Sequence, residues 1–201
     1  IYATPRAIDH ASVDFHLGLE PFVLRIGQLT LRDDSDPVHL SGRVTANRDG
    51  WGVSVMAHMD EILPARLLGY WPGELKPGTR KWIEDNVFDG VMRNVSVALT
   101  GAPGERPAFY LGAELDGAEV RFMRTMPHIT GGKGVLQLEN DRLVVSIDAG
   151  TVATDGRGNV DVAGSVFTIP DVRVREGPAR VDLMASGPIP AALWLLNRDP
   201  L

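Results

Sequence analysis

The residues whose types and spacing come closest to a metal site are His58 and Asp60, with Glu61 next to them. On a β-strand, residues two apart share a face, so this H-x-D pair could bind a metal ion. The nearest further ligand candidates are His39 and His128, and no H-E-x-x-H or similar spacing completes a set. In the structural alternative, Asp60 caps a helix that follows the strand. We favour that alternative and predict no metal site.

Two glycine-rich stretches partly match the motifs of ligand-binding loops. The sequence Gly-Gly-Lys-Gly at 131–134 lacks the phosphate-loop spacing, and a strand pattern follows it where that loop needs a helix. We expect a glycine turn or a bulge there. Residues 155–161 resemble a calcium loop but lack its ordered acidic positions and its closing Glu. We expect them to form a hairpin connection.

Catalytic nucleophiles are poorly represented. Ser165, in Ala-Gly-Ser-Val, comes closest to a nucleophile elbow but does not match G-x-S-x-G. The chain has no cysteine, which removes thiolate nucleophiles, disulfides and cysteine-based zinc sites. Carboxylate pairs such as Asp33-Asp34 and Glu84-Asp85 fall in a turn or on a solvated helix face. The sequence therefore predicts no enzymatic activity and no cofactor.

Composition limits the class of protein. The 201 residues are 44% hydrophobic and 23% charged, which is typical of a globular chain. The 22 glycines and 14 prolines favour many turns and short elements. A formal net charge of -6 argues against binding to nucleic acid, because phosphate contacts need a basic surface. No apolar run reaches the roughly 20 residues that span a bilayer.

Alternation of apolar and polar residues is the main structural signal. It marks two strands within 13–32, a hairpin through Asn47-Arg48-Asp49-Gly50, and further strands after residue 90, with a second hairpin at Asp116-Gly117. Residues 60–86 instead predict two short helices, with Thr79 as N-cap of the second.

The predicted fold class is mainly β. We expect a serial antiparallel meander of about 10–12 strands. The two-helix insert near 60–86 interrupts it, and a short helix at about 189–196 ends it. That last helix could cover an open sheet edge or dock onto a neighbouring segment.

One stretch carries a resemblance to a known family. It comprises Leu68-Gly69-Tyr70-Trp71-Pro72, Leu75-Lys76-Pro77-Gly78, and Arg80-Lys81-Trp82-Ile83 followed by Gly90. It resembles the "YWP … LKPGxRxW … G" stretch of AsmA-like, TamB/YhdP-type bacterial envelope proteins. The tail is similar too, through Ile169-Pro170-Asp171, Val181-Asp182-Leu183 and the closing Asp199-Pro200-Leu201.

The resemblance implies that the meander forms a twisted, groove-like sheet, and it implies a function without catalysis. Proteins of this family are anchored in the inner membrane, cross the periplasm, and carry phospholipid acyl chains in a β-groove towards the outer membrane. Residues 1–201 would then be a single β-rich domain, or an excised periplasmic fragment of a longer repeating β-groove protein. The implied partners are phospholipid acyl chains and adjacent segments of the same full-length protein, with membrane association through parts outside the fragment.

The alternation of apolar and polar residues also predicts which side chains line such a groove. Lipid transfer needs a continuous apolar strip, since each buried methylene contributes about 0.8 kcal/mol. The alternative is that the same faces close into the core of a scaffold or interaction domain with no ligand. Trp71 and Trp82 are predicted to anchor the two helices, with a place at the groove mouth as the alternative. The groove candidates are Leu24, Ile26, Val53, Val95, Val97, Leu99, Phe109, Leu111, Val120, Leu143, Val145, Ile147, Val181 and Leu183.

Overall fold

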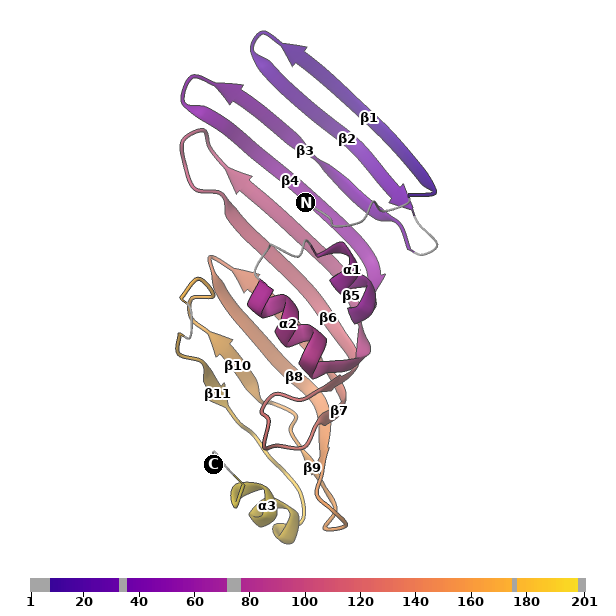
Figure 1. Ribbon diagram of the computed structural model, residues 1–201, viewed down its shortest axis with the longest axis vertical. Helices are drawn as coiled ribbons and strands as arrows, with labels where there is room; N and C mark the ends of the chain where they lie inside the picture. Colours follow the sequence, from indigo (N-terminus) through magenta and orange to yellow (C-terminus); the bar gives the residue numbers. More distant parts are fainter. Residues whose placement is uncertain (1–7, 33–35, 72–76, 175–176, 199–201) are drawn as a thin grey trace.

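The computed structural model describes residues 8–32, 36–71, 77–174 and 177–198. In this part of the chain, one 11-stranded antiparallel sheet follows the sequence order, with β9 as a short branch on β8 (Figure 1). The strands are β1 (His10–Leu19), β2 (Phe22–Arg32), β3 (Val38–Asn47), β4 (Gly50–Ile62), β5 (Val87–Gly101), β6 (Ala108–Val120), β7 (Ile129–Glu139), β8 (Arg142–Ala153), β9 (Asn159–Asp161), β10 (Val166–Ile169) and β11 (Arg180–Asp182). The helices are α1 (Pro64–Tyr70), α2 (Pro77–Asn86) and α3 (Ile189–Leu196).

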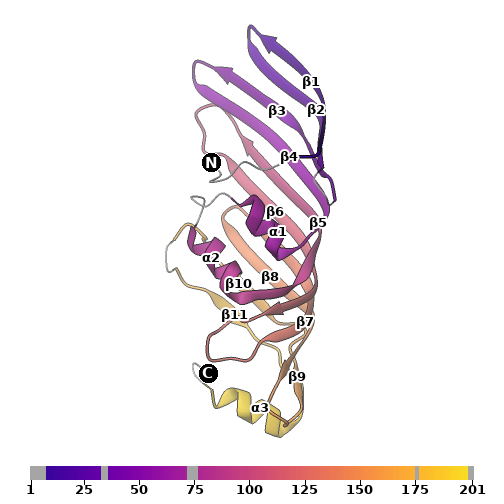
Figure 2. The ribbon, with the colours of Figure 1, turned by 45° about the vertical axis from the view of Figure 1, so that its right-hand side comes forward.

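The sheet is open, with β1 at one end of the strand order and β11 at the other. The prediction of a serial β-meander with a two-helix insert and a terminal helix is confirmed. Strands twist because of backbone chirality, and Figure 2 shows the sheet curving around α1 and α2. Both helices therefore lie on its concave side. The predicted features at Asp33-Asp34, Pro72, Leu75-Lys76 and 199–201 lie outside the described residues.

Strand register decides which side chains share a face. Paired residues in an antiparallel ladder point to the same side of the sheet. One row of such pairs is apolar from β1 to β10: Val13, Leu29, Leu40, Ala57, Val97, Leu111, Leu138, Leu143 and Ile169. We call the side that carries this row the apolar face and the opposite side the polar face.

The Asp116-Gly117 hairpin predicted from sequence is wrong. Strand β6 runs without interruption from Ala108 to Val120. Gly117 has a φ of 68°, and the pairing with β7 shifts between Leu115 and Ala118. An Asp-Gly pair supplies the positive φ of a bulge as readily as that of a turn. The expected bulge at 131–134 is confirmed, because the β7–β8 register shifts on both sides of Lys133.

The helical insert begins later than predicted. Strand β4 continues to Ile62, so Asp60 is a strand residue and does not cap a helix. Helix α1 begins at Pro64 after Leu63, which makes no side-chain cap. Thr79 lies inside α2, which begins at Pro77, so the predicted N-cap is also wrong. Proline explains both starts, because its fixed φ suits the first helical turn, where no N–H partner is needed.

Buried apolar side chains form two separate clusters. The central cluster consists of Ile62, Val95 and Ala113, below α1. The second lies at the C-terminal end of the sheet and consists of Met126, Val152, Val160, Val162, Ala191 and Leu195. Two small clusters at separate places leave other parts of the apolar face without a covering layer.

Candidate functional site

The candidate site is the apolar face itself. Its longest row crosses nine strands in eight steps from Val13 to Ile169. With neighbouring strands about 4.8 Å apart, the row is roughly 38 Å long. It crosses the strands in their order in the sheet, and they follow one another along the molecule from β1 to β10 (Figure 1). A continuous apolar path of this length suits an extended hydrocarbon chain lying across the strands.

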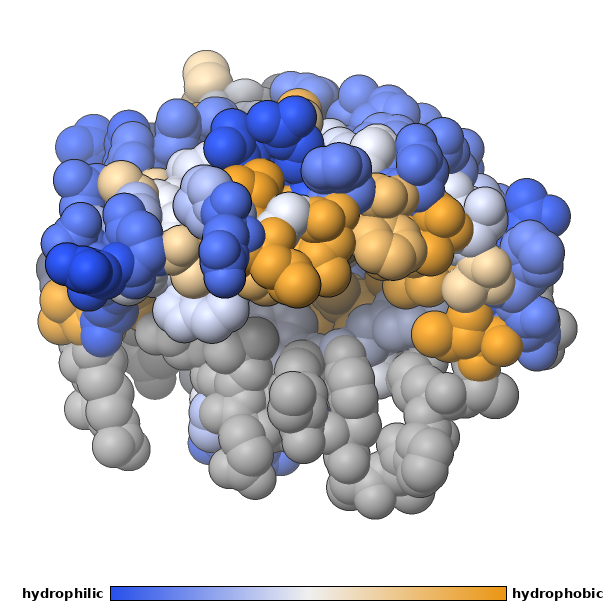
Figure 3. Space-filling model, turned by 90° about the horizontal axis from the view of Figure 1, so that it is seen from above, coloured by the Kyte–Doolittle hydropathy of each residue, from blue (hydrophilic) through white to orange (hydrophobic). Residues whose placement is uncertain are grey.

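The N-terminal end of the apolar face is exposed. On β1, Phe15 is 56% and Leu19 is 71% exposed, and both pair with apolar residues of β2. Trp51 of β4 is 65% exposed and makes an edge-to-face contact with Phe22 at 5.5 Å between ring centroids. Seen from above, a band of apolar side chains borders a hydrophilic upper surface (Figure 3). Large contiguous apolar patches are rare on soluble monomers and are typical of binding surfaces.

The middle of the apolar face is covered by α1. Leu67 and Tyr70 pack against the central cluster, in which Val95 is 2% and Ala113 is 5% exposed. Val97 and Leu111, which belong to the long row, border the same cluster. The row therefore borders the core below α1 at β5, where Val97 and Leu111 are half-buried.

Helix α3 covers part of the C-terminal end. Ala191 and Leu195 of α3 are buried against Val152 and Val160, and Phe122, Met123 and Ile129 pack around them. The outward side of α3 remains exposed at Ile189, Leu193 and Leu196. The helix thus covers the end of the sheet and also presents an apolar surface of its own.

Register places most of the predicted groove residues together. Leu24 and Val53 share one row, Ile26, Leu99 and Phe109 share the next, and Val97, Leu111 and Leu143 belong to the long row. Val145 and Val181 share a row through Phe167, and Val95 pairs with Met59 of the central cluster. Ile147 packs on the C-terminal cluster.

Two groove candidates lie apart from these rows. Val120 pairs with Ile129, beside the C-terminal cluster. Leu183 follows β11 and is exposed. Candidates that the sequence analysis missed include Val13, Phe15 and Leu17 of β1, although the alternating run from residue 13 carried their signal.

The contacts of Trp71 and Trp82 do not test the anchoring roles predicted for them. Trp71 is half-buried, and its backbone N–H donates to the Leu67 carbonyl at 3.0 Å. Trp82, on α2, is 46% exposed. Leu67 and Tyr70 make the apolar contacts of α1 with the central cluster, so the anchoring roles of Trp71 and Trp82 stay predictions.

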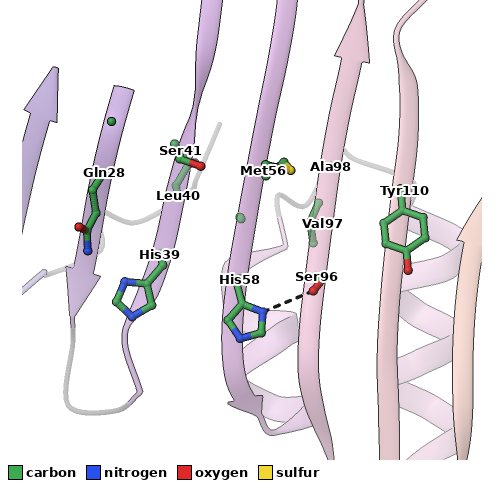
Figure 4. Close-up of a pocket in the computed structure, with 12 residues that line it drawn as sticks. Gln28, His39, Leu40, Ser41, Met56, His58, Ser96, Val97, Ala98 and Tyr110 are labelled. Atoms are coloured by element: carbon green, nitrogen blue, oxygen red, sulfur yellow. Dashed lines mark hydrogen bonds between the residues drawn. The ribbon is translucent and has the colours of Figure 1, made fainter. Parts of the chain in front are cut away.

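The polar face carries a shallow open depression of about 480 Å³. His39 and His58 are cross-strand partners, and both rings border it together with Tyr110 (Figure 4). His58 Nδ1 lies 3.4 Å from Ser96 Oγ, and His58 Nε2 lies 3.3 Å from Asp60 Oδ1. The H-x-D pair thus shares a face, as its spacing indicated.

This Ser-His-Asp chain is poorly suited to catalysis. Both contacts are long for hydrogen bonds, and the Asp60 side chain is 76% exposed. Strand β4 beside it is paired with β3 and β5, so its backbone N–H groups serve the sheet ladder rather than an oxyanion. In the described part of the chain, no group of three or more His, Cys, Asp or Glu residues could hold a metal ion.

The other sequence motifs have structural roles. The buried Ser165 hydroxyl donates to the Met184 carbonyl at 3.0 Å, which ties β10 to the segment after β11. Residues 155–158 lie in the turn between β8 and β9, and residues 159–161 form β9, which pairs antiparallel with β8, so the predicted hairpin connection is confirmed. Asp116 accepts hydrogen bonds from Lys133 and Arg93, and these cations lower the pKa of its carboxyl.

Comparison with known proteins decides the family. A model of the YhdP protein family matches residues 2–201, almost the whole chain. The chain belongs to the YhdP family. The resemblance to AsmA-like envelope proteins is thereby confirmed, and YhdP is a family of bacterial cell-envelope proteins. Comparisons with curated proteins and with solved structures give no match. Among the described residues of this YhdP segment, none of the helices is long and apolar enough to cross a bilayer.

Proposed function

We propose that this YhdP segment is a non-enzymatic part of a periplasmic β-groove that guides phospholipid acyl chains between the inner and outer membranes. The inner-membrane anchor of such a protein and the adjacent groove segments would be supplied by other parts of the polypeptide. The polypeptide would contribute a path, and the energy and direction of transport would come from elsewhere.

The observation that carries the proposal is the long apolar row. Its residues come from nine strands and are all apolar, from Val13 to Ile169. In a domain with a closed core, a second layer covers the apolar face of the sheet. Here the face extends beyond the covered middle to Phe15 and Leu19, which remain largely in water. The direction of the row also fits a chain that travels along the molecule.

The polar face supports the proposal that hydrocarbon binds on the apolar face. Its rows include His39–His58–Ser96 and Arg25–Arg43–Ser54, which are polar from strand to strand. A sheet with one wet and one apolar face can hold hydrocarbon on one side while the other faces water.

A closed-core scaffold without a ligand is the second candidate. The two buried clusters favour it, because α1 and α3 already cover parts of the apolar face. In that case the exposed surface on β1 and β2 would be buried by a neighbouring protein segment.

Tryptophan quenching separates the two candidates. We would mix the chain with phosphatidylethanolamine/phosphatidylglycerol vesicles whose acyl chains are brominated. Trp51 lies on the apolar face, so the groove proposal predicts quenching that is largely lost in Trp51→Phe. The matched control is Trp194→Phe, since Trp194 packs on the C-terminal cluster beside Arg198. No quenching in any of these proteins would favour the scaffold.

A further inference from the structure

The two ends of the sheet differ in how they are protected from further pairing. At one end, β11 has only three residues, and its Arg180 and Asp182 form a salt bridge. At the other end, β1 has ten residues and pairs with β2 alone among the described strands (Figure 1). It contains no lysine, arginine or proline, although lysine and proline commonly keep an exposed edge strand from pairing. Strand β1 therefore offers a long, unprotected edge to a further strand.

The side chains of β1 alternate between the two faces of the sheet. Val13, Phe15 and Leu17 lie on the apolar face and are 46–56% exposed. Asp14 and His16 lie between them on the polar face. Opposed residues of an antiparallel ladder share a face, so a strand that pairs with β1 must have the same alternation. A second copy of β1 meets this condition.

The charges of β1 select one register for such a pair. With Phe15 opposite Phe15 of the second copy, residues 11–19 of one strand pair with residues 19–11 of the other. Val13 then lies opposite Leu17, and the two-fold symmetry gives this contact twice. Asp14 lies opposite His16, also twice. Pairing about Asp14, over residues 10–18, is as long but sets the two Asp14 carboxylates against each other, which is destabilising.

The apolar rows beyond β1 fit the same register. Val13 begins the long row of the apolar face, and it would lie opposite Leu17 of the second copy. Leu17 pairs with Leu24, whose own row continues through Val44 and Val53. The apolar face would therefore continue from one copy into the next without a polar interruption.

The polar face adds charge complementarity. In each copy His16 pairs with Arg25, and Arg25 pairs with Arg43, so a row of basic side chains leads to the edge of the sheet. In the register about Phe15, this row ends opposite Asp14 of the second copy. Asp14 and Arg25 would be two strand spacings apart, about 10 Å, which is within the range of electrostatic attraction at moderate salt.

We infer that β1 is a dimerisation strand, which pairs antiparallel with β1 of a second copy about Phe15 and joins the two sheets into one. This inference goes beyond the proposed function, because a groove segment as such needs no second copy. The dimer places the two apolar faces end to end and pairs the open edge of each sheet.

An exchange of charges tests the pairing. Sedimentation equilibrium of residues 1–201 at micromolar concentrations should give the mass of two chains. Asp14→Arg and His16→Asp should each raise the dimer Kd at least tenfold, because each change acts twice in a symmetric pair. The double variant again sets opposite charges against each other and should recover the original Kd to within about threefold. The matched control is Asp60→Arg, which makes the same change of charge at an exposed position of β4 and should leave the Kd unchanged.

Two results would overturn the inference. A monomer at every concentration would assign the edge of β1 to a strand from another part of the polypeptide. A dimer whose Kd does not respond to Asp14→Arg, or is not recovered in the double variant, would place the contact elsewhere. Circular dichroism should show every variant folded, because Asp14 and His16 are exposed.

Disulfide formation reports the register directly, because the chain has no cysteine. In Phe15→Cys the two thiols lie opposite each other with Cβ atoms about 5 Å apart, so the protein should oxidise to a covalent dimer. Ser12→Cys lies opposite Gly18, and its two thiols are roughly 20 Å apart along the ladder, so it should not crosslink. Equal crosslinking of both variants, or of neither, would contradict the register. Lipid takes no part in these measurements, so their failure would leave the proposed function standing.

Discussion

Phe15→Ala is the sharpest perturbation of the exposed apolar surface. Phe15 is 56% exposed on β1 and pairs with Ile26. Full burial of a phenylalanine side chain contributes about 1.5–3 kcal/mol. The part still in water would therefore contribute about 0.8–1.7 kcal/mol on contact with an acyl chain, which corresponds to a loss of about 4- to 17-fold in affinity for the variant.

Met56→Ala is the matched control. Met56 is 61% exposed, which is close to the 56% of Phe15, but it lies on the polar face between Ser41 and Ala98. General adhesion of lipid to exposed apolar side chains would affect both variants alike. The proposal instead predicts that Met56→Ala changes the affinity less than twofold.

The assay is titration with a fluorescent fatty acid below its micelle concentration, for the chain and both variants. Urea unfolding should show that Phe15→Ala loses only about 1 kcal/mol, because less than half of the side chain is covered. Equal loss of affinity in both variants, or no loss in Phe15→Ala, would refute the assignment of lipid to the apolar face.

Three further predictions concern the fold. Ile62 is 2% exposed in the core below α1, so Ile62→Ala should lower the free energy of unfolding in urea by about 2–5 kcal/mol. Leu19→Ala, at a largely exposed position, should lower it by less than about 1 kcal/mol. Similar losses in both variants would contradict a core at β4. The hydrogen bonds from Arg173 lower the pKa of Asp171 to about 2 from an ordinary value of 3.8. This pair therefore stabilises the fold above about pH 4, and its contribution is lost as the pH falls towards 2. NMR titration of the carboxyl should find this pKa, and Arg173→Gln should return it towards 3.8. Gly134→Ala should destabilise the β7–β8 pair by about 1–3 kcal/mol, because the added Cβ meets the Ser146 carbonyl, and wild-type stability by thermal unfolding would rule out this close approach.

Alternation was sufficient to predict the strands and most of their facing residues. Each strand carries a period-two pattern, and a serial meander is the simplest connection between strands joined by short turns. Positions such as Leu24, Val97 and Val145 therefore fell on the apolar face without knowledge of the register.

Local geometry was less predictable. Asp-Gly at 116–117 forms a bulge because β6 keeps its partners on both sides, which depends on residues far away in the sequence. Asp60 and Thr79 have the chemistry of N-caps, but prolines at 64 and 77 determine where the helices begin.

The covering of the apolar face could not be predicted from periodicity. A face covered by a helix and a face covered by lipid have the same alternating pattern. Only the tertiary arrangement shows that Leu67 and Tyr70 contact Ile62 and Val95, while Phe15 stays exposed. The depression between His39, His58 and Tyr110 likewise depends on register between strands.

The central claim is that the apolar face holds phospholipid. The most direct test is to purify residues 1–201 without detergent and to measure bound lipid by mass spectrometry after extraction. The account predicts near-stoichiometric phospholipid that is lost in Phe15→Asp and retained in Met56→Asp, with both variants folded by circular dichroism. A folded protein free of lipid, or equal retention in both variants, would contradict it.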